Sequence, residues 1–154
     1  MRNFFHIPVF FLVFFLLMTD FSKAIELDIL KKNKNNVIRD AEKTAKQLYR
    51  AIELGDLEDV KNFQTELDIN FQDRNGITPL YFSVFHNQTE LVSYYLRNKA
   101  DINISDNDGL SPLHVAGLEN LPGMVVLLLN NEAEINARDR DGYTPLHIAI
   151  DQNN

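Results

Sequence analysis

The sequence predicts an all-α solenoid of stacked helix-turn-helix units that are joined by β-turn fingers. Three glycines, Gly76, Gly109 and Gly142, lie 33 residues apart. Each glycine stands in a run of the form Asp-x-x-Gly-x-Thr/Ser-Pro-Leu, and apolar residues at helical spacing follow the run. A fixed period of this size is typical of repeat architectures, in which each unit buries its apolar face against its neighbours.

Each unit is predicted to begin with a turn and a capped first helix. In the Asp-x-x-Gly segment the Asp side chain accepts backbone hydrogen bonds, and Gly supplies a positive φ. A Thr or Ser then stands at the N-cap, and a Pro follows at the first helical position, where its missing N–H costs nothing. Asn87 and Asn120 are expected in the left-handed conformation after the first helix. The capping residues are Thr78, Pro79, Ser111, Pro112, Thr144 and Pro145.

A second helix is predicted wherever an apolar stripe follows the first one. In two units the stripe occupies positions i, i+1, i+4 and i+5. The last unit, 139–154, has a first helix but no second stripe. We therefore expect it to serve as a makeshift cap or to be the remainder of a longer array. The stripe residues are Leu91, Val92, Tyr95 and Leu96, and Met124, Val125, Leu128 and Leu129.

The full pattern Asp-x-x-Gly-x-Thr/Ser-Pro-Leu-His-x-Ala resembles the ankyrin repeat, over roughly residues 40–154. The resemblance implies that the motif histidines, His114 and His147, are structural and bond near the turns of their own and the neighbouring repeat. Tyr81 takes this position in an earlier unit. The units are an atypical N-terminal cap repeat 40–72, two repeats 73–105 and 106–138, and a truncated repeat 139–154.

Residues 1–24 have the pattern of a secretory signal peptide. Arg2 precedes an apolar run from Phe4 to Met18, and the small residues Ser22 and Ala24 stand at positions −3 and −1 of a cut after Ala24. The run is shorter than the ~20 residues that span a bilayer comfortably. We expect cleavage, export to a secreted or periplasmic location, and no membrane attachment afterwards; the alternative is an uncleaved membrane anchor. Residues 25–39 are predicted to be a polar linker.

Composition excludes several function classes. The formal charge of −7, without a basic cluster, argues against a nucleic-acid partner. The absence of cysteine excludes disulfides, zinc fingers and thiol catalysis, and its combination with abundant Asn, Lys and Ile favours a bacterium with an AT-rich genome. A calcium loop starting at Asp101 fails, because Asp106 and Pro112 stand where Gly and Glu are needed. No catalytic motif is visible. We therefore predict no enzyme, no metal and no cofactor.

The remaining candidate for function is a surface. In ankyrin arrays, partners usually contact the turn tips and the first helices, so the resemblance implies a non-enzymatic, monomeric module that binds a protein. The apolar residue after each turn glycine forms a row that we expect to be exposed; alternatively, some members pack against neighbouring turns. The candidate contact residues are Arg74, Asn75, Ile77, Phe85, Asn107, Asp108, Leu110, Leu118, Glu119, Arg140, Asp141 and Tyr143.

Two other functions stay open at this point. The chain is alternatively a truncated remnant or a structural subunit of a longer array, with no partner of its own. An enzyme or a metal protein would need convergent polar side chains in a concave site, and none is visible in the sequence.

Overall fold

The computed structural model describes residues 31–32, 34–35 and 39–152. The predicted signal peptide, residues 1–24, lies outside the described residues. In the predicted linker, Lys31, Lys32, Lys34 and Asn35 have helical backbone and are exposed. The repeats fall within one compact unit, residues 41–154, and the following paragraphs concern that unit.

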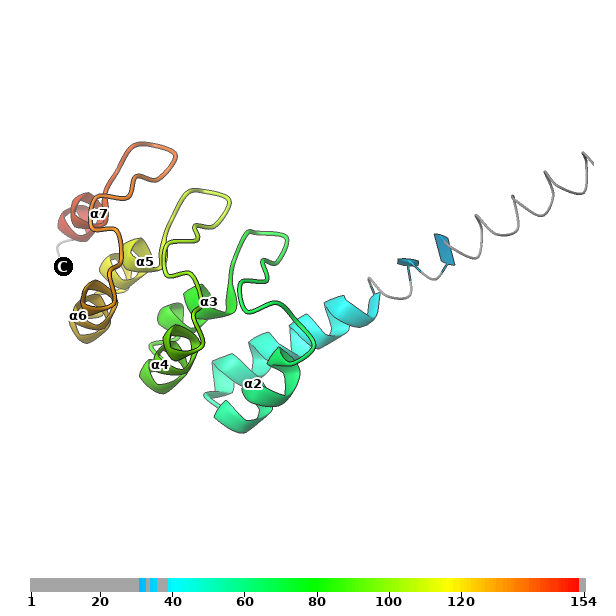
Figure 1. The fold of residues 1–154 in the computed structure, drawn as a ribbon. Helices are drawn as coiled ribbons and strands as arrows, with labels where there is room; N and C mark the ends of the chain where they lie inside the picture. Colours follow the sequence, from blue (N-terminus) through cyan, green and yellow to red (C-terminus); the bar gives the residue numbers. More distant parts are fainter. Residues whose placement is uncertain (1–30, 33, 36–38, 153–154) are drawn as a thin grey trace, which may run out of the picture. The chain divides into compact units, whose positions relative to one another are not determined.

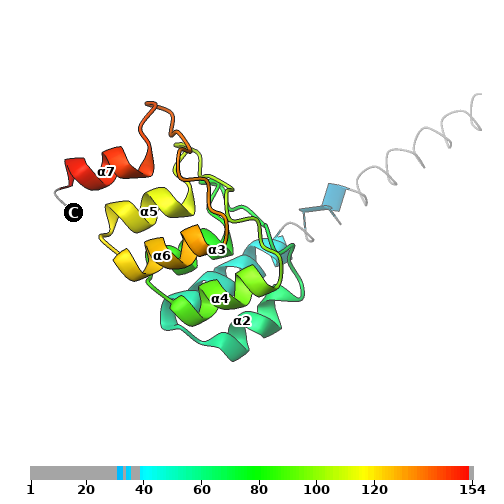
Figure 2. The ribbon, with the colours of Figure 1, turned by 60° about the vertical axis from the view of Figure 1, so that its left-hand side comes forward.

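The described residues form helices joined by loops and contain no β-strand, which confirms the predicted all-α class. Residues 39–54 are helical and precede α2. Figures 1 and 2 show the later helices stacked in pairs, α3 with α4 and α5 with α6, and α7 beside α5 at the end of the stack. No described helix has the length and apolarity that crossing a membrane requires. The helices are α2 (Leu57–Gln64), α3 (Pro79–Phe85), α4 (Thr89–Arg97), α5 (Pro112–Leu118), α6 (Pro122–Asn130) and α7 (Pro145–Asp151).

Three fingers project from the same side of the stack (Figure 1), and each contains the predicted turn. In the first finger, the Asp73 carboxylate accepts hydrogen bonds from the backbone N–H of Asn75 at 2.8 Å and of Ile77 at 2.9 Å. Asp106 and Asp139 make the same two bonds in the next fingers. The Asp-x-x-Gly segments are therefore self-capped turns, as the sequence predicted.

Adjacent fingers are joined by backbone hydrogen bonds. Asn107 N–H donates to the Asn75 carbonyl at 2.8 Å, and Arg140 N–H donates to the Asp108 carbonyl at 3.0 Å. Gly76 has a φ of +79°, and a Cβ there would lie 2.8 Å from the Asn107 nitrogen. Glycine is thus needed twice over, for the turn itself and for the close approach of the next finger.

The helix ends follow the predicted caps. Thr78 Oγ1 accepts a hydrogen bond from the Tyr81 N–H at 3.1 Å, and a proline is the first residue of α3, α5 and α7. Asn87 and Asn120 have φ angles of 54° and 52°, which confirms their left-handed conformation. Lys99 and Glu132 adopt the same conformation after the second helices, at φ 64° and 65°. The sequence did not indicate these two, because their side chains are not the ones that favour left-handed backbone.

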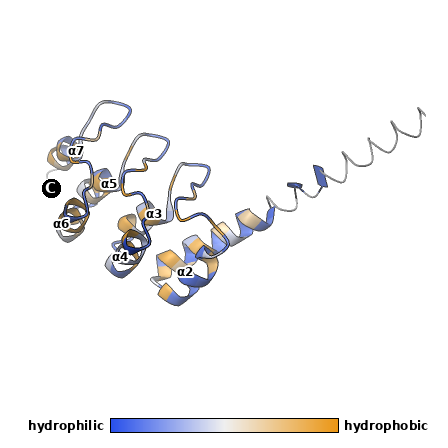
Figure 3. Cartoon of the chain, in the orientation of Figure 1, coloured by the Kyte–Doolittle hydropathy of each residue, from blue (hydrophilic) through white to orange (hydrophobic). Residues whose placement is uncertain are grey.

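Figure 3 shows hydrophobic residues along the helices of the stack. The buried ones from successive units form one core cluster. Leu48, Leu80 and Leu113 occupy the same motif position and are at most 3% exposed. In α6, Met124 and Leu128 are buried, whereas Val125 is only partly buried and Leu129 is 36% exposed. The predicted stripe on α6 therefore has one covered side and one open side.

Candidate functional site

His114 links two repeats through both ring nitrogens. Its side chain is fully buried. The Nδ1 atom accepts a hydrogen bond from the Ser111 backbone N–H at 3.1 Å and lies 2.8 Å from Ser111 Oγ. Because Nδ1 is an acceptor, Nε2 carries the proton and donates to the Tyr143 carbonyl of the next unit at 3.1 Å. With both nitrogens engaged, His114 acts as a structural residue.

Two tyrosines take the place of this histidine in the earlier units. The Tyr49 hydroxyl donates to the Ile77 carbonyl at 2.6 Å, and the Tyr81 hydroxyl donates to an Asp106 carboxylate oxygen at 2.7 Å. Burial raises the pKa of both hydroxyls above the usual range, with further contributions from the charges of Asp73 on Tyr49 and Asp106 on Tyr81. They remain neutral donors at all physiological pH values and hold the repeats together.

His147 repeats the first half of this arrangement in the last unit. Its Nδ1 accepts from the Thr144 backbone N–H at 3.2 Å and lies 2.8 Å from Thr144 Oγ1. Its side chain is exposed, and among the described residues its Nε2 has no hydrogen-bond partner. The same motif residue is therefore structural in one unit and accessible in the next.

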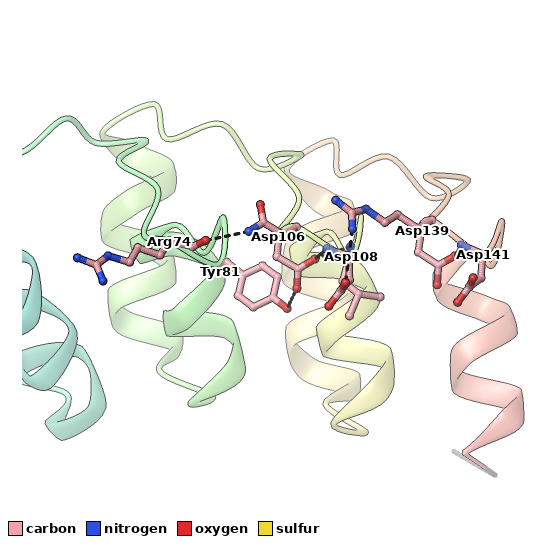
Figure 4. A network of polar contacts seen from close by, with 9 residues as sticks. Arg74, Tyr81, Asp106, Asp108, Asp139 and Asp141 are labelled. Atoms are coloured by element: carbon pink, nitrogen blue, oxygen red, sulfur yellow. Dashed lines mark hydrogen bonds and ion pairs between the residues drawn. The ribbon is translucent and has the colours of Figure 1, made fainter.

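The predicted finger-tip residues are exposed and lie along the row of fingers (Figure 4). Arg74 forms an ion pair with Glu42 of the first helix. Arg140 lies 3.9 Å from the Asp108 carboxylate, in a pair that is 70% and 82% exposed. Exposed ion pairs of this kind are worth little in water, about 0–1 kcal/mol. The tip charges are therefore free to exchange these partners for others. The remaining tips are Asn75, Asn107 and Asp141.

For the row of Ile77, Leu110 and Tyr143, the structure supports the alternative of packing at the first two positions and the expected exposure at the third. Ile77 and Leu110 are half-buried and pack against the core, whereas Tyr143 is 54% exposed. The physical reason is the stacking of fingers: a following finger lies beside Ile77 and beside Leu110. No described finger follows Tyr143.

Three predicted residues from two units meet in one hollow of about 210 Å³. We call it the Tyr143 hollow. Leu110, Leu118 and Tyr143 supply its apolar side chains, together with Ile148 of α7. The sequence reasoning missed Ile148, Asp151 and Gln152 as lining residues and assigned His147 only a structural role. The 33-residue period contained a signal for two of them, since Asp151 stands at the repeat position of Leu118 and Gln152 at that of Glu119.

Phe85, another predicted contact residue, lies in an aromatic cluster on the neighbouring first helix. It is 46% exposed. Its ring centroid lies 5.1 Å from that of His86 and 6.4 Å from that of Phe82, and Phe82 in turn meets Tyr49 at 5.0 Å. The sequence reasoning missed Phe82, although it stands three residues before Phe85 on a short helix. Glu119, at the end of α5, is exposed.

A family model for ankyrin repeats, in three copies, matches residues 48–139 of the chain. The chain belongs to the ankyrin-repeat family. No curated protein matches the chain closely enough to count as a relative. Ankyrin repeats are generally protein–protein interaction modules and typically lack enzymatic activity.

Within the part of the chain that the structure describes, no three His, Cys, Asp or Glu side chains converge in a way that would hold a metal ion. Chemically, the exposed groups of this ankyrin stack supply apolar contact area, hydrogen bonds and charges of both signs. These are the elements of a surface that recognises another protein.

Proposed function

We propose that this ankyrin-repeat chain is an exported, non-enzymatic, monomeric module that binds a protein partner through the Tyr143 hollow. The observation that carries the proposal is the convergence of Leu110, Leu118 and Tyr143 from two units around one hollow. Tyr143 is 54% and Leu118 38% exposed. A rigid, accessible tyrosine beside apolar side chains is typical of a binding hot spot, since it combines apolar area with a hydrogen-bonding group.

Charges of both signs surround this hollow on the neighbouring finger tips and helix end. Arg140, Asp108, Asp141 and Glu119 are exposed. Such rim charges steer encounter and select the orientation of a partner more than they add affinity. The Phe85 cluster and the tips Arg74, Asn75 and Asn107 extend the same surface towards the first repeats. The net charge of −7 supports a protein partner over a nucleic acid.

Binding is tested by a cross-linking pull-down with the wild-type chain from lysates of the source organism and of any host organism. The Leu118→Ser/Tyr143→Ser variant removes the apolar contacts of the hollow. Val126→Ser is the matched control, because Val126 is 58% exposed on α6 and does not line the hollow. We expect one partner that the wild type and Val126→Ser capture and that the double variant loses. Equal capture by all three chains refutes the proposal.

Folding must be compared in the same experiment. Because the two replaced side chains are partly exposed, the urea midpoint of the double variant should lie close to that of the wild type. A large loss of stability instead assigns Leu118 and Tyr143 to packing and removes them from the binding surface.

Export is supported by Arg2, the apolar run to Met18 and the small residues that end at Ala24. Mass spectrometry of the protein recovered outside the cytoplasm should find a chain that begins at Ile25. An intact N-terminus in the membrane fraction supports the alternative, a retained membrane anchor. An intact chain found only in the cytoplasm contradicts export.

A structural subunit or remnant of a longer array remains the alternative function. The exposure of Leu146 at 66% and Ile150 at 63% on α7 favours this alternative. The residues 33 positions earlier on α5, Leu113 and Gly117, are buried. This alternative predicts no specific capture through the Tyr143 hollow.

A further inference from the structure

A second hollow lies between α5, α6 and α7, and it shares no lining residue with the Tyr143 hollow. Its volume is about 330 Å³, and its lining is predominantly apolar. We call it the α6–α7 groove. The side chains that matter for its chemistry are Leu113, Val125, Leu129, Ile135, Leu146 and Ala149.

The repeat period shows what kind of environment these residues occupy elsewhere in the molecule. Of the residues that stand 33 positions earlier, five are buried, and the sixth, Leu96, is partly buried. The exposed fractions of the five are 1% for Leu80, 0% for Val92, 8% for Ile102, 3% for Leu113 and 0% for Ala116. In the groove, by contrast, Leu129 is 36%, Ile135 57% and Leu146 66% exposed. The same residue types at the same repeat positions are therefore largely buried between the two complete repeats and more exposed in the groove. Exposed apolar side chains gathered on one face mark a binding surface.

The molecule also shows what covers the earlier, closed interface. The nine-residue helix α6 packs against α5. Its buried side chains, Met124 and Leu128, belong to the same core as Leu80, Val92 and Ala116. In the preceding repeat, α4 buries Leu91, Val92 and Tyr95 in the same way and is also nine residues long. The shape that fits such an interface is therefore a short amphipathic helix.

Charge indicates the chemistry of that helix. The residues that line the groove lie within the segments 112–138 and 143–152. These segments carry four exposed acidic residues, Glu119, Glu132, Glu134 and Asp151, and one exposed base, Arg138, whose guanidinium donates a hydrogen bond to the Gly142 carbonyl at 2.8 Å. An occupant with basic residues beside its apolar stripe is favoured by this field. Helix α4 has such residues at its C-terminal end, since Arg97 is its last residue and Lys99 stands two positions beyond it.

A second copy of the chain is a poor occupant. Two α6–α7 grooves facing each other would bring two acidic surfaces together. At the other end of the stack, the exposed residues of helix 41–54 and α2 are almost all polar or charged, with Leu54 as the apolar exception. Neither the groove of a second copy nor its N-terminal helices therefore present an apolar stripe flanked by basic residues.

We propose that the α6–α7 groove docks an amphipathic, basic-flanked helix of a partner protein, seated as α6 is seated on the preceding repeat. The occupant presents apolar side chains at i, i+1 and i+4, the spacing of Leu91, Val92 and Tyr95 in α4. This site shares no lining residue with the Tyr143 hollow, so the chain has two separate binding surfaces. The α6–α7 groove is the one that accepts a helix.

The test uses a fluorescent peptide with the sequence of residues 88–100, which contains α4. A hydrocarbon link between the positions of Thr89 and Ser93 holds it helical, because a free helix of this length is marginal in water. Fluorescence anisotropy with the full chain should show saturable binding. The Ile135→Ser/Leu146→Ser variant should bind at least about tenfold more weakly, because it loses two apolar contacts.

Three controls keep the outcome clear. Val126→Ser should bind like the wild type, because Val126 is exposed on α6 outside the groove. A peptide with Leu91→Ser and Tyr95→Ser should not bind. The Leu118→Ser/Tyr143→Ser chain should bind the peptide normally, which separates this proposal from the function of the Tyr143 hollow. Urea midpoints verify that each variant is folded.

Two results overturn the proposal. The first is the absence of saturable binding, or binding that Ile135→Ser/Leu146→Ser leaves unchanged. The second is a dimer of the wild-type chain in sedimentation that Leu146→Ser dissolves, since a second copy would then be the occupant of the groove.

Discussion

The repeat 106–138 and the last unit, 139–152, carry the same motif but differ in burial. Their turn glycines have almost the same φ, +84° at Gly109 and +85° at Gly142. Their motif histidines both bond to the N-cap residue through Nδ1. Yet His114 is fully buried, whereas His147 is exposed.

The comparison separates two levels of structure. A unit of about 33 residues determines its own turn and caps, because these depend on hydrogen bonds within a few residues. Burial comes from the next unit, since one helix pair is too small to cover its own apolar face. Consequently, the same residue types stabilise the middle repeat and provide open surface on the last unit.

The largest expected difference is between the motif leucines. Leu113→Ala should lower the free energy of unfolding by about 2–5 kcal/mol, because it leaves a cavity in the core. Leu146→Ala should lower it by less than about 0.5 kcal/mol, because the side chain is 66% exposed. Urea unfolding followed by circular dichroism measures both. Similar losses for the two variants would show that α7 is as well packed as α5.

Alkaline pH should weaken the stacked part of the molecule. Burial, as the first cause, raises the pKa of Tyr81 and Tyr95 above the ordinary value of 10.0. Above pH 10 the unfolded chain therefore releases these protons and the folded chain keeps them. Stability is fully present below that pH and falls above it, by about 1.4 kcal/mol per pH unit for each tyrosine.

Urea midpoints measured between about pH 9 and pH 11 test this slope. The Tyr95→Phe variant should lose part of it. At neutral pH the same variant should be at least as stable as the wild type, because the Tyr95 hydroxyl is buried without a hydrogen-bond partner among the described residues. An unchanged slope would place the Tyr95 hydroxyl in contact with water.

The motif histidines should differ in the same direction as the leucines. His114→Ala leaves the Tyr143 carbonyl and the Ser111 N–H without their partner and should lower stability by about 1–3 kcal/mol. His147→Ala removes only exposed hydrogen bonds and should lower it by less than about 1 kcal/mol. Thermal and urea unfolding of both variants compare them. A larger effect at His147 would contradict its assignment as an accessible residue.

The smallest expected difference is between the turn glycines. Alanine at either position meets the left-handed backbone penalty of about 1–2 kcal/mol. At Gly109 the new Cβ would also lie 2.9 Å from the Arg140 backbone nitrogen, whereas at Gly142 the nearest atom is 4.0 Å away. Gly109→Ala should therefore be the more destabilising by about 1 kcal/mol. Equal midpoints would mean that the fingers separate without loss of stability.

The part of the fold that was predictable from sequence is the part with local causes. Asp73, Thr78 and Asn87 act as the turn, cap and left-handed residues that their chemistry indicated. Of the candidate site, Leu118 and Tyr143 were predicted to be accessible and are, but Ile77 and Leu110 are half-buried. Their burial depends on the finger of the following repeat and cannot be predicted from the residue type alone.

The sequence alone thus determined the repeat period, the family and the capped elements, because each rests on hydrogen bonds and apolar spacing within one unit. Only the tertiary structure decided which repeated residues are buried. It also brought Leu110, Leu118 and Tyr143 together and opened the α6–α7 groove around Leu146. Both surfaces arise between units, where packing depends on what lies beside a residue and not on the residue type.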